Sequence, residues 1–366
     1  MRIAIIARPY SFHGGVERAT AGLLAGLVAR GEDLTLVTPG RPAPVEGVTV
    51  RRLLLPPLPA GARLLAMAVA VRWAVRRGRW DVVQSHERTL GQDVYRAGEG
   101  CHRAYLAGMA PPRRRRVYHA IALGLERQLF ARTPRIVAIA ARGRQEIERC
   151  YAVPGPRLSV IYNGVDLDRF HPDNRTRHFA SARREAGLSA EGFAILFVGS
   201  GFERKGLASA IEALAALPDS TAHLLVVGKG SRAPFERLAA ERGVSARITW
   251  LGARPDTERW YAAADAVVLP ARYEPFGNVY LEALASGVPV IASSRAGGAE
   301  LIEDGVNGYV VDPFDAAATA RGLEQIRAGD AAAMVAAARR SAEPFTHAAQ
   351  AERFARVYRE LRSARS

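Results

Sequence analysis

The segment FAILFVGSGFERKG, residues 193 to 206, shows the pattern that decides the fold class. Its first seven residues form a short apolar run, which is typical of a strand buried on both faces of a parallel sheet. A glycine-rich turn with a basic pair follows, and a helical pattern begins behind it. This order of strand, turn and helix indicates one βα unit of an open α/β sheet.

The same unit recurs along the whole chain. In the first half we predict strands at Arg2–Ala7, Asp33–Thr38, Val48–Leu54, Val82–Ser85, Ile136–Ile139 and Leu158–Tyr162. In the second half we predict them at Phe193–Gly199, Ala222–Gly228, Ile248–Leu251, Ala266–Pro270, Val288–Ala292 and Tyr309–Val311. This repetition predicts two Rossmann-like, doubly wound domains.

The domain boundary is predicted in the segment from Asn163 to Pro172, which starts with an Asn-Gly turn and ends with a proline. Residues 1–165 then form one domain and residues 166–345 the other, and a C-terminal helix at about 346–366 can pack back on the first. A chain of 366 residues is long enough for two such cores. Because open α/β sheets bind ligands at the carboxyl ends of their strands, we expect the site in the cleft between the domains.

The composition excludes several classes of protein. With 49% hydrophobic and 24% charged residues, the chain is globular rather than disordered or fibrous. Two cysteines, Cys101 and Cys150, cannot build a disulfide framework. The first seven residues have the pattern of a strand and lack the apolar length of a signal peptide. We therefore expect a cytoplasmic protein.

The positive charge is concentrated in the first half. Residues 1 to 165 hold 26 arginines against 11 acids, whereas the remainder holds 25 basic and 25 acidic residues. An excess confined to one half predicts a polyanionic partner for that half: a phosphorylated glycolipid, a membrane surface or nucleic acid. Of the 51 basic residues only Lys205 and Lys229 are lysines.

One segment, Leu64–Val75, is apolar apart from Arg72. It is too short to cross a hydrocarbon core, which needs about 20 residues. We expect it to be a buried helix.

Two glycine-rich turns are candidates for a diphosphate site. Gly199 precedes the pair Arg204-Lys205 just beyond a strand end, so both cations can point into the cleft. Gly14 and Gly15 stand between the first strand and the first helix, where backbone N–H groups can approach a phosphate. The alternatives are a solvated basic turn at the first position and a tight strand-to-helix connection at the second.

The segment EPFGNVYLEA, residues 274 to 283, is the strongest candidate for a site. Glu274 follows a predicted strand, Gly277 permits a close backbone approach, and a helix starting near Asn278 places Glu282 about one turn in. A carboxylate can accept hydrogen bonds from sugar hydroxyls, each contributing about 1.5–3 kcal/mol. The alternative is a pair of solvated glutamates at the start of a helix.

Together these motifs resemble glycosyltransferase family 4, whose members are retaining enzymes of the GT-B fold that use nucleotide sugars. The resemblance rests on Glu274-x₇-Glu282, Arg204-Lys205, Gly14-Gly15 and the turn Asn163–Asp166. Within the family, residues 91–101 and 199–206 are most similar to glucosyltransferases of the lipopolysaccharide core.

The resemblance implies a role for each matching residue. Glu282 would hold the ribose hydroxyls, Arg204 and Lys205 would neutralise the diphosphate, and Glu274 would hold the donor sugar. The implied catalytic set is Arg204, Lys205, Glu274 and Glu99, and the implied donor-binding set is Gly14, Gly15, Gly199, Phe276, Gly277, Asn278, Val279, Glu282 and Arg254. Glu99 stands where the similar enzymes have an aspartate. Many members have a histidine in this region, but His102 is out of register, and we expect it to be a surface histidine.

A metal site is not expected. Asp166-Leu167-Asp168 has the D-x-D form that binds a divalent ion in the other large glycosyltransferase architecture. Its position beside an Asn-Gly turn favours turn and capping chemistry instead. Arg204 and Lys205 would also make an ion unnecessary, so we predict neither a metal nor another cofactor.

The segment from Arg103 to Arg132 contains the densest basic run, followed by apolar residues at four-residue spacing. The run is Arg113, Arg114, Arg115 and Arg116. It suits an interfacial helix facing anionic lipid, where each cation contributes about 1 kcal/mol. A core-facing helix with a solvated basic end fits equally well. No aromatic platform or known module supports nucleic acid as the partner.

The resemblance, together with the basic first half, implies a retaining enzyme that moves a hexose, which we expect to be glucose, from a UDP-sugar to a lipopolysaccharide core or another lipid-linked saccharide. Its partners would be the UDP-sugar donor, a phosphorylated glycolipid acceptor and the anionic inner face of the cytoplasmic membrane, with no nucleic acid. The alternatives are a nucleotide-sugar epimerase or hydrolase on the same fold and a non-catalytic binder of anionic lipid.

Overall fold

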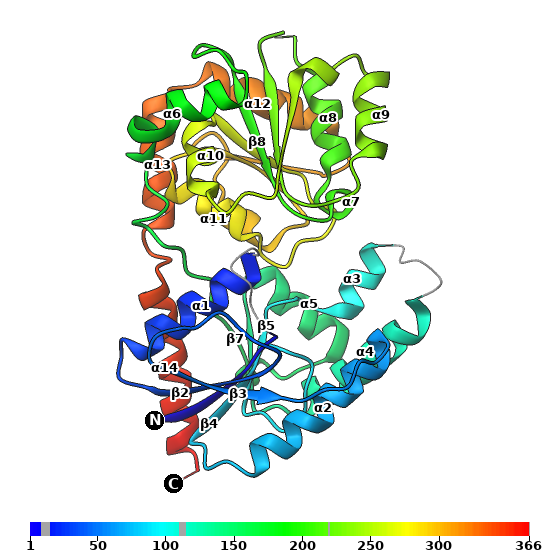
Figure 1. The fold of residues 1–366 in the computed structure, drawn as a ribbon, viewed down its shortest axis with the longest axis vertical. Helices are drawn as coiled ribbons and strands as arrows, with labels where there is room; N and C mark the ends of the chain where they lie inside the picture. The colour runs from blue at the N-terminus through cyan, green and yellow to red at the C-terminus, as the bar shows by residue number, and fades with distance from the viewer. Residues whose placement is uncertain (9–14, 110–114, 219, 366) are drawn as a thin grey trace. The chain divides into compact units, whose positions relative to one another are not determined.

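The computed structural model describes residues 1–8, 15–109, 115–218 and 220–365, and it divides into two compact units. Unit 1 comprises Met1–Gly164 together with His347–Ser366, and unit 2 comprises Val165–Thr346 (Figure 1). Each unit is built on one sheet of parallel strands. The first strand of each unit, β1 or β8, lies inside the sheet; the next two strands are added on one side of it and the later strands on the other side. The predicted class, α/β with two doubly wound sheets, is confirmed.

Unit 1 contains a seven-stranded sheet in the order β3-β2-β1-β4-β5-β6-β7. Its strands are β1 (Arg2–Ile6), β2 (Asp33–Pro39), β3 (Val48–Leu53), β4 (Val82–Ser85), β5 (Val94–Ala97), β6 (Arg135–Ala138) and β7 (Leu158–Val160). Its helices are α1 (Gly15–Val28), α2 (Ala60–Arg76), α3 (His102–Gly108), α4 (Arg116–Arg132), α5 (Ala141–Tyr151) and α14 (His347–Ser363), with a 3₁₀ turn at Gly155–Arg157.

Strand β5 is the one that the sequence analysis missed. Its third residue is Arg96, which interrupts the apolar run that marks a buried strand. The side chain of Arg96 is nevertheless buried, and its Nη2 donates a hydrogen bond of 2.6 Å to Oδ1 of Asn163. A buried arginine that is hydrogen-bonded through its Nη2 therefore stands where the pattern of a buried strand expects an aliphatic residue.

Unit 2 contains a six-stranded sheet in the order β10-β9-β8-β11-β12-β13. Its strands are β8 (Ala194–Val198), β9 (His223–Val227), β10 (Ile248–Gly252), β11 (Ala266–Leu269), β12 (Val290–Ser293) and β13 (Gly308–Val311). Its helices are α6 (Asn174–Glu185), α7 (Phe202–Lys205), α8 (Leu207–Ala216), α9 (Ala233–Glu241), α10 (Thr257–Ala263), α11 (Asn278–Ala285), α12 (Ala316–Ala328) and α13 (Ala331–Ala342), with 3₁₀ turns at Ser245–Arg247 and Gly297–Leu301.

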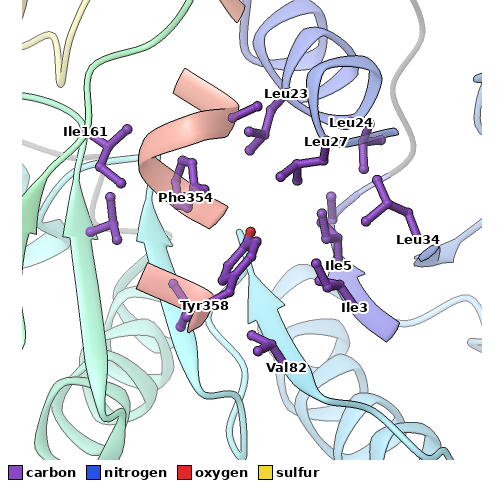
Figure 2. Packing of buried hydrophobic residues seen from close by; sticks show 14 of the residues in the cluster. Ile3, Ile5, Leu23, Leu24, Leu27, Leu34, Val82, Ile161, Phe354 and Tyr358 are labelled. Atoms are coloured by element: carbon purple, nitrogen blue, oxygen red, sulfur yellow. The ribbon is translucent and has the colours of Figure 1, made fainter. Parts of the chain in front are cut away.

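The C-terminal helix α14 completes the core of unit 1. Phe354 and Tyr358 are fully buried, and they share one apolar cluster with Ile3 and Ile5 of β1 and with the leucines of α1 (Figure 2). The hydroxyl of Tyr358 donates a hydrogen bond of 2.7 Å to Oε1 of Gln84 in β4. The last helix of the chain is therefore part of the fold of its first strands.

The predicted segment forms helix α2, but only one side of this helix is buried, so the expectation of a buried helix is correct for that side alone. Met67 and Val71 pack in a cluster with residues of β1, β2 and β4. Leu65, Val69 and Trp73 are instead 46%, 70% and 54% exposed. A run that is apolar on every side gives no periodic signal that separates its covered face from its open face. Within the described residues, no helix is both long and apolar enough to cross a membrane.

We predict that Phe354→Ala lowers the free energy of unfolding of unit 1 by roughly 3–5 kcal/mol, because it leaves a cavity between α14 and the sheet. Phe354→Leu is the matched control and should cost much less, since it keeps most of the volume. Hydrogen exchange locates the effect: protection should fall in β1 and α1 and remain in β8. Equal loss of protection in both units would contradict this role of α14.

Candidate active site

Arg204 and Lys205, the last two residues of α7, converge on one carboxylate. Nη1 of Arg204 lies 2.9 Å and Nζ of Lys205 lies 2.5 Å from Oε2 of Glu274. The side chains of Lys205 and Glu274 are 11% and 12% exposed, and that of Arg204 is 34% exposed. The structure thus brings three members of the predicted catalytic set into one ion-paired cluster.

The sheet order places this cluster. Lys205 follows β8 and Glu274 follows β11, and these strands are neighbours whose carboxyl ends share one edge. The carbonyl oxygen of Arg204 accepts a hydrogen bond of 2.9 Å from the N–H of Arg272, which ties the two loops together. Gly206 has a φ of +79°, and a Cβ there would lie 1.8 Å from the carbonyl oxygen of Pro270. Only glycine allows this approach.

The cluster keeps its carboxylate charged. Burial alone would raise the pKa of Glu274, but Lys205 and Arg204 outweigh it and hold the pKa below its ordinary value. Glu274 is therefore an anion at neutral pH. It fixes the position of two cations that point to the same place.

The loop before α11 presents backbone groups beside this cluster. Gly277 precedes the helix with a φ of +89°, and the carbonyl oxygen of Phe276 accepts a hydrogen bond of 2.7 Å from the N–H of Gly298. The ring of Phe276 is buried, so this residue can contribute to a ligand only through its backbone. Asn278 and Val279 open the helix and are half-buried.

Glu282 lies one turn into α11 and is 4% exposed. The hydroxyl of Tyr261, from α10, donates a hydrogen bond of 3.0 Å to its Oε2. Tyr261 was not predicted from the sequence, because no local pattern connects residues of two different helices. The bond orients the carboxylate that the resemblance assigns to the ribose.

The other predicted donor-binding residues lie in several places. Gly199 follows β8, and a Cβ there would lie 3.2 Å from Cγ of Lys205, so this glycine leaves room for the lysine side chain. Gly15 is the first residue of α1, while Gly14 lies outside the described residues. Arg254 follows the edge strand β10, where it pairs with Glu185 and stacks over the ring of Trp260. The structure therefore gives Arg254 partners other than the Glu274 cluster.

Unit 1 carries a second charge cluster at the carboxyl ends of its strands. Nη2 of Arg8 and Nη1 of Arg88 lie 2.5 and 2.6 Å from the two carboxylate oxygens of Glu99. Arg8 also pairs with Glu87. Burial raises the pKa of Glu99, but Arg8 and Arg88 lower this pKa by more than burial raises it, so the pKa lies below its ordinary value. Arg8 and Arg88 were not predicted as site residues. Their positions just after β1 and β4, where ligand-binding residues gather in such sheets, are the sequence feature that could have identified them.

His102 is buried rather than exposed, so the expectation of a surface histidine was wrong. Its Nε2 lies 3.1 Å from Nδ1 of His119. Oε1 of Glu126, a fully buried residue of α4, accepts a hydrogen bond of 2.7 Å from the N–H of His102 and holds the start of α3. Burial, with the charge of Arg88, lowers the pKa of His102 to about 4. His102 is therefore neutral at pH 7.

The D-x-D string makes a turn. Oδ1 of Asp166 accepts hydrogen bonds of 3.1 and 2.9 Å from the N–H groups of Asp168 and Arg169. Within the parts of the chain that the structure describes, no three His, Cys, Asp or Glu side chains are grouped so that they could hold a metal ion. Independence from metal stays a prediction.

The predicted membrane run is described only in part. Arg113 and Arg114 lie outside the described residues, and Arg115 and Arg116 are exposed at the start of α4. Further along this helix Leu125 and Leu129 are buried in unit 1. The apolar positions in the second half of α4 thus cover the core, whereas Val117, beside the solvated basic end, is 72% exposed.

Comparison with known proteins identifies the family. A profile described as "Glycosyl transferases group 1" matches residues 179–341, and one described as "Glycosyltransferase Family 4" matches residues 13–169. The D-inositol 3-phosphate glycosyltransferase of Thermobispora bispora is 33% identical over 308 residues, which cover 77% of this chain and 71% of that one. The chain is an enzyme of the GT-B fold and belongs to glycosyltransferase family 4.

Two solved structures are also similar. The crystal structure of WaaG, a glycosyltransferase of lipopolysaccharide biosynthesis, has a TM-score of 0.83 and 25% identity over 97% of this chain and 99% of that one. In sequence, the lipopolysaccharide glucosyltransferase WaaG of Escherichia coli is 31% identical over 64% of each chain. Anabaena HepE, solved with UDP and glucose, has the same fold, with a TM-score of 0.77 and 18% identity over 98% of this chain and all of that one.

We predict that Glu274→Gln lowers the free energy of unfolding by roughly 3 kcal/mol at pH 7, because it leaves two cations without their carboxylate. The folded-state pKa of Glu274 is depressed, so its contribution is complete above the unfolded pKa and is lost as the pH falls through the folded pKa. Urea unfolding at several pH values should show the gap between parent and variant closing in acid.

The matched control is Glu212→Gln, which removes one partner of an exposed pair with Arg242 and should cost less than about 1 kcal/mol. A Glu274→Gln variant as stable at pH 7 as this control would mean that the cluster is solvated.

Proposed function

We propose that the chain transfers a hexose, which we take to be glucose, from a UDP-sugar to a phosphorylated, lipid-linked saccharide with retention of configuration. The observation that carries the proposal is the pairing of Arg204 and Lys205 on Glu274 at the carboxyl edge of unit 2. Two fixed cations at such an edge suit a diphosphate, and an adjacent carboxylate suits sugar hydroxyls. The similarity to a glucosyltransferase and the UDP and glucose in the HepE structure support the choice of donor.

In the proposed donor complex, Glu282 accepts hydrogen bonds from the ribose and stays oriented by Tyr261. The diphosphate takes Lys205 and Arg204 as its counterions, and Glu274 is left to accept from the donor sugar. A metal ion is not needed to neutralise the diphosphate, because Arg204 and Lys205 already converge on Oε2 of Glu274.

The proposed step is a front-face displacement. The acceptor oxygen forms a bond to the anomeric carbon while the bond to the diphosphate oxygen breaks. The acceptor proton passes to the departing diphosphate. Lys205 and Arg204 stabilise the negative charge as it develops on the leaving group, which is where preorganised charge contributes most to rate.

Two features support an anionic acceptor. The excess of positive charge lies in residues 1 to 165, the half that would bind the acceptor. Relatives are named for D-inositol 3-phosphate and for lipopolysaccharide. We infer a phosphorylated glycolipid at the inner face of the cytoplasmic membrane, with the enzyme bound peripherally.

The deciding experiment incubates the purified chain with a panel of nucleotide sugars, with and without saccharide acceptors. Transfer predicts that nucleoside diphosphate release from one donor rises when an acceptor is present, and that the anomeric configuration of the product matches that of the donor. Equal release without an acceptor favours a hydrolase, and an altered sugar without release favours an epimerase. A protein that turns over no donor would be a non-catalytic binder of lipid.

We predict that Lys205→Ala lowers turnover by about a hundredfold or more and affects binding of the bare nucleoside much less, because the charge that it meets grows as the bond breaks. Arg237→Ala removes an exposed cation from α9 and is the matched control, with turnover near that of the parent. Steady-state rates measure both. Turnover of Lys205→Ala within about threefold of the parent would remove the pair from the mechanism.

We predict that chelator leaves the reaction rate unchanged and that added magnesium raises it little, since the two cations already neutralise the diphosphate. The measurement is the initial rate after exhaustive treatment with EDTA. Strict dependence on a divalent ion would contradict this account and would favour Asp166 and Asp168 as ligands of that ion.

A further inference from the structure

The open face of α2 carries a stripe of large apolar side chains. Leu65, Val69 and Trp73 recur at four-residue spacing, which aligns them on one side of the helix. They are 46%, 70% and 54% exposed, and Leu54 in the segment before the helix is 88% exposed. Single exposed apolar residues are ordinary, but a contiguous row of them marks an interaction surface.

The charge around this stripe has one sign. Residues 47 to 80 contain seven arginines and neither aspartate nor glutamate. The guanidinium of Arg77 stacks 3.5 Å above the ring of Trp73, at the end of the stripe. An apolar row that ends in an aromatic ring and arginines has the composition of a helix lying in the interface of an anionic membrane.

A basic hollow lies beside the stripe. Arg72 and Arg76, one turn apart on α2, and Arg132 at the end of α4 line a cavity of about 240 Å³, with Gln92 and Thr133 also in its wall. No acidic residue lines it, and in the described part of the chain none of these three arginines has a carboxylate partner. Nε2 of Gln92 donates a hydrogen bond of 3.0 Å to Thr133, so the uncharged polar groups are satisfied internally.

The hollow is held by the packing of two helices. Helices α2 and α4 lie side by side in unit 1 (Figure 1). A Cβ at Gly61 would lie 3.0 Å from Cδ1 of Ile121, so the helices touch closely at this crossing. Three guanidinium groups gathered without an anion repel one another, and a phosphate would remove that cost through charge-assisted, bidentate hydrogen bonds.

We propose that α2 docks unit 1 on an anionic membrane, with Leu65, Val69 and Trp73 in the interface and one lipid headgroup phosphate in the hollow of Arg72, Arg76 and Arg132. None of the residues named for this surface belongs to the run Arg113–Arg116. The inference rests on the proposed function only in that both put the acceptor at a membrane.

Vesicle sedimentation tests the hollow. The full chain is compared with Arg72→Gln/Arg76→Gln/Arg132→Gln on phosphatidylcholine vesicles with and without phosphatidylglycerol. Loss of three cations at the surface should weaken binding to the anionic vesicles about a hundredfold. The control Arg353→Gln/Arg356→Gln/Arg359→Gln removes the same charge from the exposed side of α14 and should bind within about threefold of the parent. Equal binding by the two triple variants, or equal binding of the parent to both kinds of vesicle, would overturn the proposal.

Inorganic phosphate separates the two sources of the same chemistry. Without vesicles, inorganic phosphate should raise the melting temperature of the parent no more than that of the Arg72→Gln/Arg76→Gln/Arg132→Gln variant. A larger rise for the parent would mean that the hollow takes the free ion, and the lipid assignment would fall.

Quenching by brominated lipids tests insertion of the stripe. Part of the tryptophan fluorescence of the parent should be quenched on anionic vesicles, and Trp73→Phe should abolish this quenching while Trp80→Phe keeps it. Quenching that persists in Trp73→Phe would contradict the proposed orientation.

Transfer to a water-soluble acceptor should be unchanged in the Arg72/Arg76/Arg132 variant. Inability of the parent to transfer would count against the proposed function and leave the vesicle results standing, so the two failures are distinguishable.

Discussion

A carboxylate that is taken out of water stays charged when cations or hydrogen-bond donors lie beside it, and Glu274 meets this condition through Lys205 and Arg204. The loops that follow β8 and β11 position these three residues. Because β8 and β11 are neighbours in the sheet, the loops that follow them meet, and Gly206 lets their backbones touch. In the account proposed here, the donor diphosphate takes over two counterions that Glu274 has already fixed in place.

Unit 1 repeats the same physical solution with different residues. Glu99 follows β5 and is held by Arg8 and Arg88, which follow β1 and β4. Beneath it, the buried Glu126 fixes the start of α3 and so fixes His102. Each unit therefore has a carboxylate neutralised by arginine or lysine at the carboxyl edge of its own parallel sheet, where open α/β folds bind ligands.

The periodic features could be predicted from the sequence, whereas the contacts between distant segments could not. Apolar runs separated by helical spacing gave both sheets, because that pattern follows directly from burial on two faces. Strand β5 was not predicted, because arginine is usually exposed and Arg96 interrupts the apolar run, although its side chain is buried. The bond from Tyr261 to Glu282 has no local signal, and the exposure of α2 depends on which neighbours cover it. His102 was misjudged for the same reason, since its burial comes from His119 and α4.

The most direct test of the central claim uses the fact that the chain has only two lysines, Lys205 and Lys229. Lysine labelled with ¹⁵N gives two side-chain signals by NMR, which Lys229→Arg assigns. The account predicts that UDP shifts the Nζ signal of Lys205, as its partner changes from Glu274 to the diphosphate, and that uridine leaves this signal in place. A Lys205 signal that does not move when UDP saturates the protein would contradict it.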